Sequence, residues 1–155
     1  MNFTKRIFAL FLVVILCVTL VGCNEKTAVT AEQFTEIMES NDFSVVDSTL
    51  FAQTVVSSDT VLTALSDEYE LDYYKLKNET SAQHLYLLNK EAFTEQMSDT
   101  DSTSETNDGN YDYFEGVTDT DFYMTSRIGD TLIYCYTDKE YKDEITTLIK
   151  ALGYK

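Results

Sequence analysis

The fold is decided by residues 111–137, which read YDYFEGVTDTDFYMTSRIGDTLIYCYT. Three runs rich in aromatic and β-branched residues, YDYFEGVT, FYMTSR and TLIYCYT, are separated by short sequences at 119–121 and 128–130. Such runs predict β-strands, and connections of this length join neighbouring strands that run in opposite directions. The stretch therefore predicts an antiparallel meander of three strands.

An upstream hairpin is expected from residues 61–65 and 69–77. In its second strand, Tyr69, Leu71 and Tyr73 alternate with acidic residues. This alternation is typical of a strand with one face against the core and the other in solvent.

Three stretches carry weaker signals. The sequence FSVVD at 43–47 is a short strand candidate, whereas residues 48–60 mix apolar and hydroxyl side chains without a clear period. Residues 98–110, SDTDSTSETNDGN, have no apolar side chain and cannot bury enough surface to order themselves. We therefore expect a mobile acidic loop at 98–110.

Three helices are expected from capping boxes, in which a threonine is followed three residues later by Gln or Glu. The boxes begin at Thr30, Thr80 and Thr137, and each precedes apolar residues spaced along one helix face. The expected buried residues are Phe34, Ile37 and Met38 in the first helix, Ala82, Leu85, Tyr86, Ala92, Phe93 and Met97 in the second, and Tyr141, Ile145, Leu148, Ile149 and Leu152 in the third.

These elements predict an α+β fold. An antiparallel sheet of about five strands, with three helices packed mainly on one face, buries all three apolar helix stripes. Residues 30–155 are enough for one domain with a substantial core and too few for two, so we expect a single domain.

The N-terminal part of the sequence has the features of an export signal. Lys5 and Arg6 precede an uncharged apolar run at 7–21. The run is shorter than the roughly 20 residues of a membrane-spanning helix. It ends in LVGC at 20–23, which resembles the lipobox of bacterial lipoprotein precursors.

The lipobox resemblance implies that residues 1–22 are a signal peptide that is removed by cleavage between Gly22 and Cys23. It also implies that the Cys23 sulfur carries a lipid, since two or three acyl chains make a durable membrane anchor. Residues 23–29 would then be a short lipidated tether. An ordinary signal peptide cut near Gly22 and a retained anchor helix are the alternatives.

A looser resemblance covers the rest of the chain. A first helix with TAEQF at 30–34, a tyrosine-rich sheet and a terminal Lys/Glu helix ending in LGY at 152–154 are similar to the small uncharacterised lipoproteins of Gram-positive bacteria. This resemblance implies a cellular location and no activity.

The charge of the chain limits its partners. All 27 acidic residues lie after position 22 together with nine of the 11 basic ones, so the chain from Cys23 on has a formal charge of −18. Binding to nucleic acid depends on Lys and Arg displacing counterions from phosphates. We therefore expect no nucleic-acid partner.

The residue types needed for common catalytic and metal sites are scarce. After Cys23 the chain has one histidine, His84, and one cysteine, Cys135, which are too few for a zinc site. Residues 99–110 fail the calcium-loop pattern at its sixth and twelfth positions, and neither a nucleophile elbow nor a phosphate-binding glycine loop is present. We expect no enzyme activity, no cofactor and no metal.

Two single residues are also candidates. Arg127 is the only arginine after position 22, and we expect it to pair with a protein carboxylate, with capture of a carboxylate ligand as the alternative. Cys135 alternates with Ile133 on a predicted strand, the position of a small buried apolar residue.

The sequence favours a membrane-anchored extracytoplasmic lipoprotein that acts as a non-enzymatic binding module at the bacterial cell envelope. The expected partner is an envelope protein or a cell-wall component, bound by an exposed sheet face that carries tyrosines. One alternative is the solute-binding component of a transporter, for which the 133 residues from Cys23 on are short for two lobes. A small envelope hydrolase using His84 or paired carboxylates is another.

Overall fold

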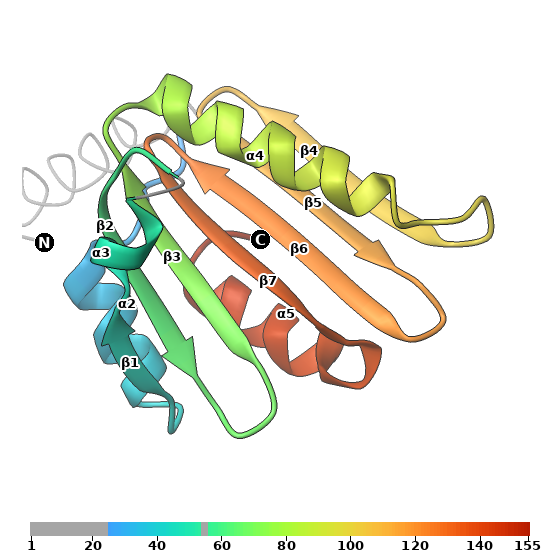
Figure 1. The fold of residues 1–155 in the computed structure, drawn as a ribbon, viewed down its shortest axis with the longest axis horizontal. Helices are drawn as coiled ribbons and strands as arrows, with labels where there is room; N and C mark the ends of the chain where they lie inside the picture. The colour runs from blue at the N-terminus through green and yellow to red at the C-terminus, as the bar shows by residue number, and fades with distance from the viewer. Residues whose placement is uncertain (1–24, 54–55) are drawn as a thin grey trace, which may run out of the picture.

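The computed structural model describes residues 25–53 and 56–155. They form one antiparallel sheet in the strand order β1-β2-β3-β7-β6-β5-β4 (Figure 1). The strands are β1 (Ser44–Asp47), β2 (Ser58–Leu65), β3 (Glu70–Leu76), β4 (Ser102–Asp108), β5 (Tyr111–Val117), β6 (Asp121–Ile128) and β7 (Thr131–Asp138). The helices are α2 (Ala31–Glu39), α3 (Thr49–Ala52), α4 (Glu79–Thr94) and α5 (Lys142–Ala151), with the 3₁₀ turn η1 (Lys139–Tyr141) before α5.

The predicted α+β class and antiparallel sheet are confirmed, whereas the counts of about five strands and three helices are too low. The meander is present, with Val117 paired to Phe122 and Ile128 paired to Thr131 at its two turns. The hairpin of β2 and β3 is also present, and β3 joins it to the meander by pairing with β7. The ambiguous residues 48–60 contain α3 and the beginning of β2.

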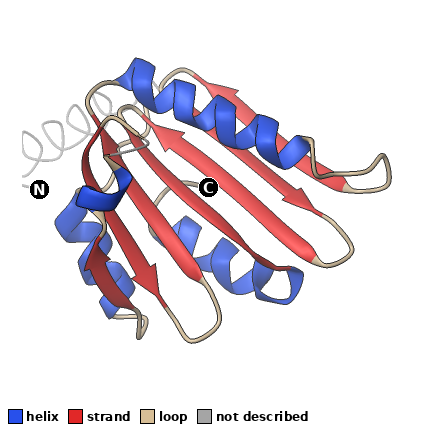
Figure 2. Cartoon of the chain, in the orientation of Figure 1, coloured by secondary structure: helices blue, strands red, loops and turns tan. Residues whose placement is uncertain are grey.

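Helices cover both faces of the sheet, so the prediction of helices mainly on one face is wrong. Figure 2 shows α4 in front of the sheet and α2 and α5 behind it. The rear core contains Phe34 and Met38 of α2 with Ile145 and Ile149 of α5. The front core contains Phe93 and other residues of α4. Because β5 and β6 are buried almost without alternation, both of their faces need cover, whereas β7 alternates between buried and more exposed side chains from Tyr134 on.

The prediction of a mobile loop at 98–110 is also wrong, because residues 102–108 form the edge strand β4. All seven of its side chains are exposed, and its backbone pairs in register with β5 from Ser102–Val117 to Asp108–Tyr111. The strand is therefore held by ladder hydrogen bonds and buries no side chain of its own. Its polar, acidic composition is typical of a protected sheet edge.

The three helix starts differ in how well the capping boxes predict them. At α2 both halves of the Thr30–Gln33 box are present. At α4 the cap is Asn78, whose side chain accepts a hydrogen bond from the Ser81 amide, so the helix begins before Thr80. At α5 no side chain caps the helix, since β7 continues through Thr137 and η1 intervenes.

Part of the expected tether is packed against the domain. The backbone of Lys26 exchanges two hydrogen bonds with the Asn110 side chain, at 3.1 and 2.8 Å. Its ammonium lies 3.6 Å from the centroid of the Tyr111 ring, and Tyr73 donates a hydrogen bond to the Val29 carbonyl. The chain is thus fixed at the β4–β5 turn, at the end of the sheet where β7 begins.

Candidate binding face

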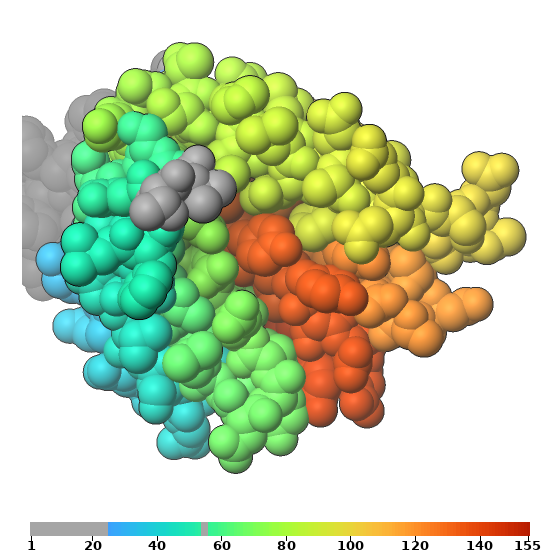
Figure 3. Space-filling model, in the orientation of Figure 1, coloured from blue at the N-terminus to red at the C-terminus, as the bar shows by residue number. Residues whose placement is uncertain are grey.

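The front of the sheet is only partly covered. In Figure 1, α4 lies diagonally over β5 and β6, and the lower halves of β3 and β7 have no helix in front of them. Figure 3 shows these strands at the surface, green and orange-red, between α4 and the N-terminal elements. We call this surface the open face and define it by Thr63 of β2, Glu70, Asp72 and Tyr74 of β3, and Tyr134 and Tyr136 of β7.

The strand register places these side chains on one surface. Thr63 lies opposite Asp72, and Asp72 lies opposite Tyr134. Directly opposed residues of an antiparallel pair point to the same side of the sheet. Tyr74 and Tyr134 also pack against the front core below α4, which fixes the side as the front.

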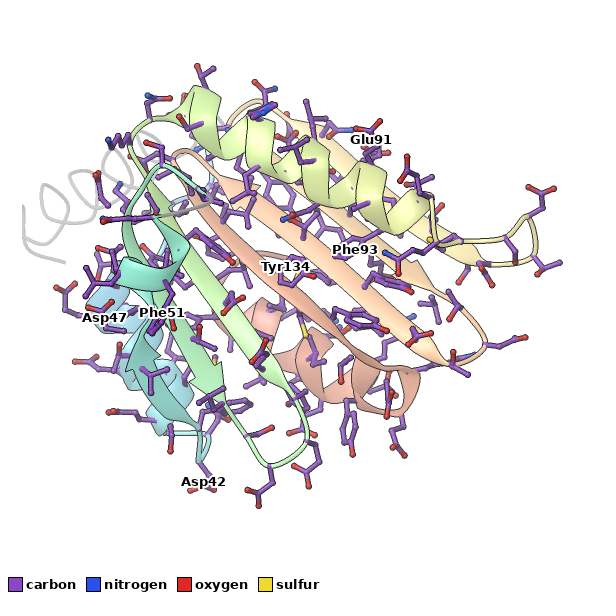
Figure 4. All side chains as sticks on the ribbon, in the orientation of Figure 1. Asp42, Asp47, Phe51, Glu91, Phe93 and Tyr134 are labelled. Atoms are coloured by element: carbon purple, nitrogen blue, oxygen red, sulfur yellow. The ribbon has the colours of Figure 1, made fainter. Side chains whose placement is uncertain are left out.

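A row of aromatic rings links α4 to the open face. Phe93 of α4 lies over Tyr134, with ring centroids 5.5 Å apart, and the two are seen together in Figure 4. Phe93 also contacts Tyr123, at 4.9 Å, and Tyr123 stacks on Tyr136 at 5.0 Å with an interplanar angle of 11°. Tyr136 ends the row and is 49% exposed. The exposed ring is therefore held in place by buried ones.

Carboxylates alternate with the rings. Asp72 accepts hydrogen bonds from the Thr63 hydroxyl at 2.6 Å and from the Tyr74 hydroxyl at 3.3 Å. Partial burial raises the pKa of Asp72, and these two hydrogen bonds act in the opposite direction. Asp121, the first residue of β6, accepts a hydrogen bond from the exposed Tyr136 hydroxyl at 3.1 Å.

These acids have no cationic partner within the part of the chain that the structure describes. The ion pairs found among residues 25–53 and 56–155 involve neither Glu70 nor Asp72, and neither Asp121 nor Asp138. Asp138 lies opposite Asp121, where β7 ends and β6 begins, so both extend the acidic character of the open face toward that edge of the strands.

Arg127, the candidate from the sequence, lies under the N-terminal end of α4 with its side chain only 2% exposed. Its guanidinium donates to Asp112 at 2.6 Å, to Glu79 at 2.9 Å and to the carbonyls of Gly129 and Gly109. All three guanidinium nitrogens are therefore used within the protein. The group joins α4 to β5 and to two turns, and it presents no edge to a ligand.

His84 is exposed on α4 and borders a small cavity beside the open face. The cavity measures about 210 Å³ and is lined by Val56, Ser57, Leu76, Ser81, His84, Leu85 and Leu88. None of these described lining residues carries a carboxylate that would orient the imidazole toward Ser81. Among the residues that line this cavity, His84 therefore has no carboxylate partner.

Cys135 lies in the rear core with its side chain fully buried, and burial raises the pKa of its thiol. A thiol in that state is a weak nucleophile. Within residues 25–53 and 56–155, no three His, Cys, Asp or Glu side chains are arranged to hold a metal ion. Cys23, Gly22 and the signal segment 1–22 lie outside the described residues, and none of the described helices is long and apolar enough to cross a membrane.

Comparison with protein families, with curated proteins and with solved structures finds no match to this chain. The sequence shows the two alternations that build the open face, Asp72-x-Tyr74 and Tyr134-x-Tyr136. Sequence reasoning did not identify them as a site, because only the placement of α4 decides which strands it leaves uncovered.

Proposed function

We propose that this chain is a membrane-anchored extracytoplasmic lipoprotein that acts as a non-enzymatic binding module at the bacterial cell envelope. The open face is the observation that carries the proposal. It combines rigidly held aromatic rings with carboxylates that lack an ion-pair partner among the described residues. Exposed groups of this kind that the domain's own helices leave uncovered are typical of an interaction surface.

The lipobox and the fixed position of Lys26 support the anchoring. Only two residues lie between Cys23 and Lys26, so the three residue steps reach about 10 Å. A lipid on Cys23 would therefore hold the β4–β5 turn close to the bilayer. Tyr136 lies near the opposite end of β7, so the Tyr136 end of the open face would lie away from the membrane and be accessible to a neighbouring envelope component.

Solute binding by a transporter component receives less support. Such proteins close two lobes on a ligand, whereas residues 25–53 and 56–155 form a single sheet. The cavity beside His84, at about 210 Å³, is below the 300 to 1,000 Å³ of common small-molecule sites. A wider hollow of about 560 Å³ beside the β2–β3 turn is lined mainly by polar and acidic side chains, whereas small-molecule sites are mostly apolar. An open sheet face is better suited to a macromolecular partner than to a small solute.

Site-specific photo-crosslinking on intact cells tests the proposal. A photoreactive residue in place of Tyr136 should capture a defined envelope component that is then identified. The same residue in place of Glu36, which is exposed on α2 at the rear, is the matched control and should capture none of it. Equal capture from both positions would contradict the proposal.

The anchor needs its own test. Cys23→Ala should leave the precursor uncut and without lipid, and the protein should no longer fractionate as a lipoprotein. Normal processing of this variant would contradict the lipid-anchor part of the proposal and leave the role of the open face standing.

A further inference from the structure

We propose that the partner bound by the open face is a basic segment of a protein, an extended stretch in which Lys or Arg side chains alternate with other residues. The inference rests on the proposed function, because it supplies that function with a class of partner. It is carried by the unbalanced charge of the face, the spacing of its groups and the chemistry of its rings.

Glu70 and Asp72 of the open face form no ion pair with the described residues. On β2, β3, β6 and β7 the only cationic side chains are Lys75 and Arg127. Arg127 is buried and paired with Asp112 and Glu79. Lys75 pairs with Asp130 at 2.6 Å and lies opposite Thr131, on the rear side of the sheet. Neither compensates Glu70 and Asp72, so the face is complementary to a cationic ligand.

The spacing of the groups fits an extended chain. Alternate residues of a strand lie roughly 6.8 Å apart on one face, and so do alternate side chains of an extended peptide. Glu70, Asp72 and Tyr74 follow this repeat along β3, and Tyr134 and Tyr136 follow it along β7. A peptide lying along these strands therefore meets a carboxylate or a ring at each second residue.

The rings and the carboxylates favour the same class of ligand. An ammonium or guanidinium group is attracted to the π face of a tyrosine, and Tyr136 offers a half-exposed ring held by its stack on Tyr123. Partial burial raises the pKa of Asp72, and no ion pair of the described residues involves this carboxylate. A bound Lys or Arg would relieve that cost by pairing with the ionised carboxylate.

Nuclear magnetic resonance titration of the full chain in nonionic detergent tests the inference. The probe is an extended peptide that alternates lysine with threonine. The comparison ligands are the same peptide with glutamate in place of lysine and a chito-oligosaccharide. We expect the lysine peptide alone to shift the resonances of Asp72, Tyr134 and Tyr136, with an affinity that falls as salt is added.

Two double variants that remove the same charge distinguish binding at the open face from nonspecific attraction to an acidic protein. Glu70→Gln with Asp72→Asn should weaken the lysine peptide about tenfold. Glu36→Gln with Glu39→Gln, on exposed positions of α2, should leave its affinity unchanged. Tyr136→Leu keeps an apolar side chain without the ring quadrupole and should weaken binding about threefold. The melting temperature of each variant verifies that it is folded.

Several results would overturn the inference: equal weakening by the two double variants, shifts confined to the acidic turns, no binding of the lysine peptide, or binding of the chito-oligosaccharide alone. Crosslinking of a partner through position 136 without any binding of the lysine peptide would refute the basic partner and leave the proposed function standing. Failure of both experiments would remove the proposed function as well.

Discussion

The two faces of the sheet are built from the same strands, yet one is closed and the other is partly open. Behind the sheet, α2 and α5 cover a core in which Phe34 and Ile145 have no exposed surface. In front, α4 covers one half, and Tyr136 remains 49% exposed beside carboxylates. The difference lies in the side chains, because the rear positions of β3 include the buried Leu71 and Tyr73 whereas the front ones include two acids. A face that carries such acids cannot be sealed by an apolar helix without leaving charges unpaired.

Core truncation gives the largest expected contrast between the faces. Phe34→Ala removes a fully buried ring that lies 5.2 Å from Tyr73, and should lower the free energy of unfolding by about 4 kcal/mol. Tyr136→Ala on the open face should lower it by less than about 1 kcal/mol. Urea unfolding of both variants measures the contrast, and similar losses would show that the front is as closed as the rear.

The Arg127 cluster is the strongest polar link on the front. Arg127→Ala leaves the Asp112 carboxylate, which is 10% exposed, without its cation and should cost about 3 kcal/mol in urea unfolding. Arg127→Met combined with Asp112→Asn removes both charges and should recover most of that loss. A double variant as unstable as Arg127→Ala would argue against an uncompensated charge as the cause.

Glu115 on the rear side is expected to stabilise the protein at neutral pH. Desolvation opposes ionisation of Glu115, but hydrogen bonds from Lys155, at 2.5 Å, and Tyr113 outweigh it and lower its pKa. A lowered folded-state pKa gives stability that is present above the unfolded pKa and is lost as the pH falls through the folded value. Glu115→Gln should therefore cost about 1 kcal/mol at pH 7. The cost should disappear in strong acid, and a cost independent of pH would contradict the assignment.

Asp72→Asn on the open face should have the smallest effect on the free energy of unfolding. Unlike the other variants, it should raise the stability. The raised pKa of Asp72 means that ionisation costs stability once the pH exceeds the unfolded value of about 3.9. Asp72→Asn keeps an acceptor for Thr63 and should stabilise the protein by about 0.5 kcal/mol at pH 7. The two proteins should converge below about pH 3. Thermal unfolding across this range measures the difference, and destabilisation at pH 7 would show that the carboxylate is compensated.

The comparison of the faces also shows how far the sequence could predict the structure. The meander, the hairpin and the Thr30 cap follow from local patterns, because alternation and capping chemistry act over a few residues. The edge strand β4 could not be predicted, since its side chains bury nothing and only pairing with β5 holds it. The open face could not be predicted either, because it depends on where α4 packs relative to strands that are distant in sequence.

Residue-resolved hydroxyl-radical footprinting tests most directly that the open face is the binding surface. The modification of Tyr136 is compared between intact cells and the purified protein, with Leu87 on α4 as the control, since it is similarly exposed at 52%. A binding role for the open face predicts that Tyr136 is protected several-fold in cells relative to Leu87. Equal modification of Tyr136 in both settings, with Leu87 unchanged, would contradict it.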